Sequence, residues 1–106
     1  MNPDHKPALT EVGTPFFEAP ASYLLRLPFA YLEELTLYFN KGVSPYSFLR
    51  AVLENDLQTA VLCNPPAMDV LVGIIELLRE AAPADAWGTN YRVIQHLQKW
   101  HTEWVR

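Results

Sequence analysis

The sequence predicts an all-α protein, a compact bundle of four helices that follows an extended proline-rich N-terminal arm. Half of the 106 residues are hydrophobic, which is enough for one core. Apolar residues recur at helical spacing in four segments, and no run reads as a strand. Five of the nine prolines lie within the first 28 residues, where they remove backbone donors and block helix formation. The chain therefore divides into an arm, residues 1–27, and a four-helix domain, residues 28–106.

The arm contains bulky apolar side chains as well as prolines. Each large one gains roughly 1.5–3 kcal/mol when it is fully buried, so we expect the second half, Tyr23 to Leu27, to pack on the helical body. Phe16 and Phe17 lie among turn-forming residues. Either packing on the body or docking on another chain fits them equally well, and both are candidate partner-binding residues.

The first predicted helix runs from about Pro28 to Asn40, and Gly42 is placed to end it. Its inward residues are predicted to be Phe29, Leu32, Leu35, Tyr38 and Phe39. Ser44 is placed to cap the second helix, with Pro45 in its first turn, where the missing N–H would have had no partner. This second helix is predicted to run to about Leu62.

The second helix has one apolar and one polar face. The apolar stripe is Phe48, Leu49, Val52, Leu53 and Leu57, at the spacing of a helix with one buried side. The solvent-exposed face supplies three more candidate partner-binding residues, Glu54, Asn55 and Gln58.

Two further helices complete the predicted bundle. Asn64 can cap a third helix, which is apolar on most of its circumference as far as Leu78 and is therefore expected to be central. Thr89 is a good cap for the last helix. One face of that helix is predicted to carry Val93, Ile94, Leu97, Trp100, His101 and Trp104, with Trp100 in the core. Trp104 is the tryptophan best placed for exposure and is the sixth candidate partner-binding residue.

No group of residues predicts catalysis, a metal or a cofactor. Cys63, the single cysteine, has no histidine near it in sequence and fits a reducing compartment. His96 and His101 are five residues apart, about 140° around a helix, whereas zinc-binding pairs on helices sit four apart. We therefore expect no enzyme activity, no catalytic residue, no metal site and no cofactor.

The charge and hydropathy of the chain restrict the kinds of partner that it can bind. The outer face of the last helix offers Arg92, Gln95, His96 and Lys99, but eight basic residues in a chain of net charge −4 fall far short of the basic stripe that nucleic acid requires. No run approaches the roughly 18 apolar residues of a membrane span, and the N-terminus lacks the pattern of a signal peptide. We expect a cytoplasmic protein that binds neither nucleic acid nor membrane.

Three motifs together resemble a widespread group of small proteins encoded by bacteriophages and prophages, a group without an assigned activity. The motifs are Phe-Leu-Arg-Ala-Val-Leu-Glu-Asn-Asp-Leu at 48–57, Ala-Pro at 82–83 and Trp-Gly-Thr at 87–89. The resemblance spans about residues 28–100. The group usually has Pro-Gly where this chain has Tyr46-Ser47, and a polar stretch with Asp and Asn where it has residues 64–69. The resemblance implies a phage origin and carries over no catalytic residue.

The sequence favours a phage accessory protein that binds a bacterial host protein or defence complex in the cytoplasm of the infected cell. Within that class, an inhibitor of host defence such as an anti-CRISPR fits best. One alternative is a self-assembling or chaperone-like virion component, which would form a homo-oligomer through the arm. Another is a small DNA-binding regulator that uses residues 90–106.

Overall fold

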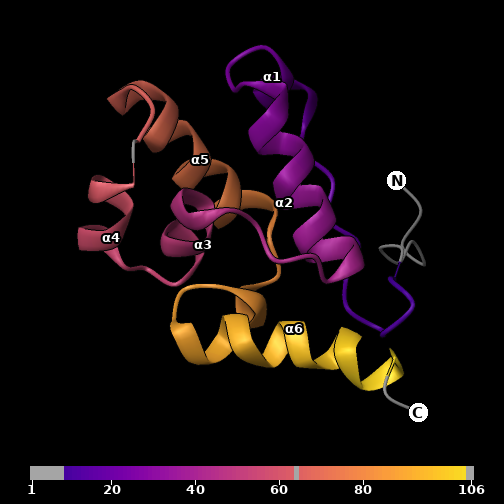
Figure 1. Cartoon of the computed structure of the whole chain (residues 1–106). Coiled ribbons are helices and arrows are strands. Elements are labelled where there is room, and N and C mark those ends of the chain that lie inside the picture. Colours follow the sequence, from indigo (N-terminus) through magenta and orange to yellow (C-terminus); the bar gives the residue numbers. More distant parts are fainter. Residues whose placement is uncertain (1–8, 64, 105–106) are drawn as a thin grey trace.

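The computed structural model describes residues 9–63 and 65–104, with the backbone alone for residues 102–104. This part of the chain is all-α (Figure 1) and its one strand-like feature is an isolated bridge between Leu9 and Pro15. None of its helices is long and apolar enough to cross a membrane. The elements are α1 (Ala21–Leu24), α2 (Phe29–Lys41), α3 (Ser47–Leu53), α4 (Leu57–Leu62), α5 (Met68–Ala81), the 3-10 helix η1 (Ala84–Ala86) and α6 (Asn90–Trp104).

The prediction of one continuous helix from Pro45 to about Leu62 is wrong, because the chain breaks between α3 and α4. Asn55 has a left-handed φ of 59°, which asparagine tolerates better than most residues. Asp56 then caps α4, and its carboxylate accepts hydrogen bonds from the Thr59 N–H at 3.1 Å and the Thr59 hydroxyl at 2.7 Å. These bonds lower the pKa of Asp56 below its ordinary value. The structure therefore contains two short helices in place of a long one.

Gly42 ends α2 as the sequence predicts. It has a φ of 69°, and its N–H points to the carbonyls of Leu37 and Tyr38, which is a left-handed helix end. A second constraint acts at the same position, because a Cβ added to Gly42 would overlap the side chain of Trp100. Gly42 is therefore required both by its backbone conformation and by the approach of α6.

The start of the next helix differs from the prediction. Helix α3 begins at Ser47, and Tyr46, rather than Ser44, occupies the cap position. The Tyr46 N–H donates to Oε1 of Glu34 at 3.0 Å, so a side chain from α2 satisfies a donor that the local sequence leaves open. Ser44 accepts a hydrogen bond from Nη1 of Arg50 at 2.8 Å instead.

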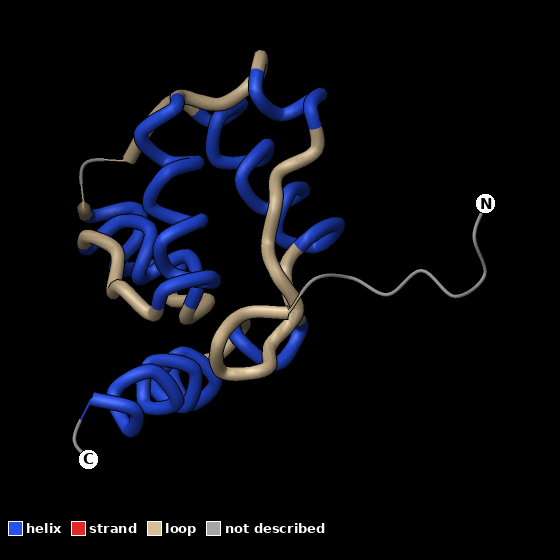
Figure 2. Tube along the Cα trace, turned by 90° about the vertical axis from the view of Figure 1, so that its right-hand side faces the viewer, coloured by secondary structure: helices blue, strands red, loops and turns tan. Residues whose placement is uncertain are grey.

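The described part of the arm, residues 9–27, is not extended throughout. Residues 9–15 form a closed loop, and residues 16–20 lead from it to α1 (Figure 2). Phe17, Tyr23 and Leu27 belong to the same hydrophobic core as α2 and α5. The Tyr23 hydroxyl also donates to Oε2 of Glu80 at 2.6 Å. The expected packing of the segment from Tyr23 to Leu27 therefore holds for its two ends only, because Leu24 and Leu25 are 56% and 94% exposed.

Helix α5 is not buried on most of its circumference. Its buried residues are Gly73, Ile74, Leu77 and Leu78, whereas Val72 and Ile75 are 44% and 40% exposed. Gly73 allows a close approach, since a Cβ there would lie 2.8 Å from Cδ2 of Leu27. A helix in the centre of the core would be buried on several sides, whereas α5 buries one face only, so the expected central position is wrong. The predicted cap, Asn64, lies outside the described residues.

Helix α6 covers the end of the core below α2 and α3 (Figure 1). Thr89 caps it as predicted, accepting from the Arg92 N–H at 3.1 Å. The buried face is Val93, His96, Leu97 and Trp100, at the i, i+3, i+4, i+7 spacing of an amphipathic helix. The burial of Trp100 confirms the prediction. The two histidines lie opposite to their predicted positions, because His96 is buried and His101 is exposed.

Candidate functional site

An apolar groove lies between the arm and α2. Its volume is about 430 Å³, within the roughly 300–1,000 Å³ of typical binding pockets. We call it the arm groove. It is lined by Phe16, Phe17, Glu18, Ala19, Leu24, Phe29, Leu32, Glu33, Thr36 and Leu37.

A buried asparagine holds the arm in place at one end of the groove. Oδ1 of Asn40 accepts from the Phe17 N–H at 2.8 Å, and Nδ2 of Asn40 donates to the Phe17 carbonyl at 2.7 Å. The Phe17 ring lies 4.8 Å from the ring of Phe39 and is fully buried. Successive side chains of an extended segment point to opposite sides, so Phe16 faces outward and remains 48% exposed.

Helix α2 forms the other wall. Leu32 is buried, while Phe29 and Leu37 are 74% and 38% exposed. The inward position predicted for Phe29 is therefore wrong, because the first turn of α2 extends past the buried core. The Thr36 hydroxyl donates to the Leu32 carbonyl at 2.8 Å, so this polar group already has a partner within the helix.

The charge at the groove is entirely negative. Glu18 from the arm and Glu33 from α2 are exposed lining residues. No lysine, arginine or histidine of the described part of the chain lines the groove. Among the described residues, neither carboxylate forms an ion pair. The arrangement is an apolar surface with one acid on each wall.

The two phenylalanines predicted to bind a partner have different surroundings. Phe16 lines the arm groove and is accessible. Phe17 is a core residue with no exposed surface, so its expected role in partner binding is wrong. The sequence alone left these alternatives open, and the bonds from Asn40 distinguish them. The side chain of Trp104 lies outside the described ones.

The predicted site on the second helix does not form one surface. Glu54 accepts from Nε of Arg50 at 2.9 Å and from Nδ2 of Asn90 at 2.6 Å. It therefore links α3 to the start of α6 and is not a free surface acid. Asn55 and Gln58 are both exposed, but they follow the break and lie on the α3–α4 turn and on α4.

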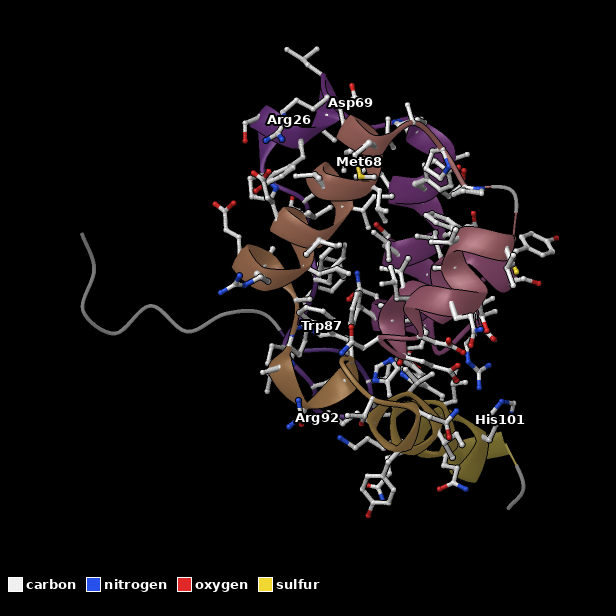
Figure 3. All side chains as sticks on the ribbon, turned by 90° about the vertical axis from the view of Figure 1, so that its left-hand side faces the viewer. Arg26, Met68, Asp69, Trp87, Arg92 and His101 are labelled. Atoms are coloured by element: carbon white, nitrogen blue, oxygen red, sulfur yellow. The ribbon has the colours of Figure 1, made fainter. Side chains whose placement is uncertain are left out.

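Asn55 lines a second, smaller hollow of about 100 Å³. Trp87 lies between α5 on one side and α3 and α4 on the other (Figure 3). Leu57 and Ile75 line the hollow as well and are 70% and 40% exposed. The inward position predicted for Leu57 is wrong, since α4 turns this residue away from the core.

The buried histidine, His96, makes contacts that connect two helices. Nε2 of His96 lies 2.7 Å from the Tyr38 carbonyl oxygen, and the two rings are 4.6 Å apart. The Tyr38 hydroxyl in turn donates to the Ala86 carbonyl at 2.6 Å. Within the described residues, no three His, Cys, Asp or Glu side chains are grouped so that they could hold a metal ion. His96 therefore joins α6 to α2.

We expect the free energy of unfolding to fall as the pH drops below about 6.5, the ordinary pKa of histidine. Burial lowers the pKa of His96, against the opposing hydrogen bond with the Tyr38 carbonyl. The unfolded chain thus binds a proton that the folded chain does not, and acid favours unfolding. Urea denaturation between about pH 7.5 and 5 measures the change, above the range where most carboxylates titrate.

His96→Gln is the control for this pH dependence. Glutamine keeps a neutral side chain that can donate to a carbonyl, so stability should become nearly flat over the same pH range. An equal slope in the variant would assign the pH dependence to other groups.

The basic residues of α6 contact the preceding segment. Nη1 of Arg92 donates to the Ala84 carbonyl at 3.2 Å, and Nζ of Lys99 lies 3.9 Å from Oδ2 of Asp85. The ion pair with Asp85 partly neutralises the positive charge of Lys99 on the face predicted for nucleic acid, and Arg92 is held against the preceding segment. His96, which belonged to the same predicted face, is buried.

Most of the arm groove could not be predicted from the sequence. Leu24, Phe29 and Leu37 were predicted to be core residues or were not assigned a role, and all three line it. Helical periodicity indicates which residues share a face but not whether another segment covers that face. One sequence feature indicated the exposure of Phe29. Pro28 precedes α2, so Phe29 is the first residue of the helix.

Comparison with known proteins gives no relative. The chain matches no family model, no curated protein and no solved structure.

Proposed function

We propose that this protein acts by binding another protein through the arm groove, without catalysing a reaction. The supporting observation is the exposure of Phe16, Leu24, Phe29 and Leu37, which are 38% to 74% exposed around one groove. Large apolar side chains that stay exposed together are typical of interaction sites. A core anchor beneath them, Phe17, keeps the surface in a fixed shape, which reduces the entropy lost on binding.

We further propose that the protein is a phage accessory protein and that its partner is a bacterial host protein. Inhibition of a host defence system, in the manner of an anti-CRISPR, in the cytoplasm of the infected cell is the form we favour. The resemblance of residues 28–100 to small phage and prophage proteins supports this proposal. The small size and the net charge of −4 suit a protein that acts by occupying a surface.

Phe29→Ser should weaken partner binding by at least about tenfold, as expected for an aromatic anchor at an interface. The matched control is Leu25→Ser, because Leu25 is 94% exposed nearby but does not line the groove. The measurement is affinity capture from bacterial lysate with the full chain and both variants, followed by titration of the purified partner. Equal retention by both variants would contradict the proposal.

A cellular assay tests the host-defence part separately. Expression of the chain in bacteria with an active CRISPR system should restore plating of a targeted phage. Phe29→Ser should lose the effect and Leu25→Ser should keep it. Normal defence in the presence of the wild-type chain would reject inhibition of that system. A concentration-dependent oligomer in light scattering that Phe29→Ser abolishes would favour the self-assembling alternative.

A further inference from the structure

The rim of the arm groove carries a charge pattern that selects among partners. Glu18 comes from the arm and Glu33 from α2, so the two carboxylates belong to opposite walls. Both are exposed, and neither forms an ion pair with any cation in the described part of the chain. All other lining residues are apolar except Thr36, whose hydroxyl is already bonded within α2.

We infer that the arm groove binds a segment of the partner protein in which two or three large apolar side chains are flanked by lysine or arginine. This inference rests on the proposed function and specifies the chemistry of the partner. The apolar side chains would fill the volume of about 430 Å³, and the flanking cations would pair with Glu18 and Glu33.

The openness of the walls favours a protein segment over a small molecule. Phe29 is 74% exposed and Leu24 is 56% exposed, so much of the apolar surface faces outward. Sites for small molecules bury most of the ligand surface. Covering side chains that project this far requires an occupant that extends beyond the groove, as a chain segment does.

The unpaired acids favour basic flanks over neutral or acidic ones. A neutral segment would remove water from both carboxylates without replacing it by an opposite charge. An acidic segment would add repulsion across a few ångströms, and like-charge contacts are an effective means of excluding wrong partners. A second copy that presented the same face would bring its own two acids against this rim.

The test is selection from a random library of about 12-residue peptides on the immobilised full chain. Peptides enriched on the wild type but not on Phe29→Ser are groove binders, and we expect them to contain large apolar residues flanked by lysine or arginine. The leading peptide should bind the double variant E18Q/E33Q about tenfold more weakly. Each exposed charge pair contributes modestly to the affinity, and this variant loses both pairs. Its affinity should also fall as salt rises.

The matched control removes two acids elsewhere. Glu11 and Asp69 are exposed and do not line the groove, so E11Q/D69N has the same net charge as E18Q/E33Q. Its affinity for the leading peptide should change by less than about twofold. An equal loss in both double variants would mean that the net charge alone attracts the peptide, and this would overturn the inference.

The remaining outcomes separate the inference from the proposed function. Groove binders that are neutral or acidic would overturn the inference and leave the proposed function standing. No peptide that distinguishes the wild type from Phe29→Ser would count against both. A dimer that Phe29→Ser dissociates and the leading peptide displaces would make a second copy the occupant, which also overturns the inference.

Discussion

Gly42→Ala should destabilise the fold by about 2–4 kcal/mol. The left-handed backbone at φ 69° costs an L-residue about 1–2 kcal/mol. In addition, the new methyl group would overlap Cβ and Cγ of Trp100, and such overpacking typically costs 1–3 kcal/mol. Urea denaturation followed by tryptophan fluorescence measures the change, because Trp100 lies at the affected contact.

Gly13→Ala separates the two contributions. Gly13 has a comparable φ of 84°, but a Cβ there would have no atom within 4 Å. We expect a loss of only about 1–2 kcal/mol at this position, from the backbone alone. Equal losses at Gly42 and Gly13 in the wild-type background would contradict the contact with Trp100.

Asn40→Ala should destabilise the protein by about 2–4 kcal/mol and release the arm from α2. The substitution removes the two hydrogen bonds to the Phe17 backbone. Phe17 is fully buried, and an unsatisfied buried polar group costs about 1–3 kcal/mol. Hydrogen exchange at the Phe17 amide should become faster, along with a lower urea midpoint.

The control for Asn40→Ala is Asn90→Ala. Asn90 also donates a side-chain hydrogen bond, to Glu54 at 2.6 Å, but it is exposed. Water can replace that bond, so the expected loss is below about 1 kcal/mol. Because the arm forms one wall of the groove, Asn40→Ala should also weaken partner binding. A protected Phe17 amide in the variant would show that the core contacts hold the arm without Asn40.

Much of the helical structure could be predicted because the signals are local. Gly42 ends a helix, Thr89 caps one, and the stripe from Phe48 to Leu53 faces the core, as their sequence neighbourhoods indicate. Each of these features depends on backbone conformation or on spacing within one helix. The main error, the continuous second helix, came from apolar spacing that carries on across the turn. Asn55 and Asp56 contained the correct signal, a residue suited to left-handed backbone followed by a cap.

The candidate site was only partly predictable. Phe16 was identified, but the arm groove also depends on Phe29 and Leu37, whose exposure could not be read from helical periodicity. Glu33 of α2 is exposed and lines the groove. Nothing in the sequence indicated that Glu18 would lie on the opposite wall of the groove from Glu33. That juxtaposition joins residues 15 positions apart through the packing of the arm on α2.

The sequence by itself determined the all-α class, the helix ends at Gly42 and Thr89 and the apolar content of the arm, because these follow from conformational preference and composition. Only the tertiary structure decided which apolar side chains are covered. Asn40 binds the backbone of Phe17 across 23 residues, and Trp100 packs against Gly42 from α6. These long-range contacts bury one phenylalanine of the adjacent pair and leave the other exposed beside Phe29. Whether a side chain is buried depends on which segments pack together. That packing results from all the contacts of the fold and not from any local sequence pattern.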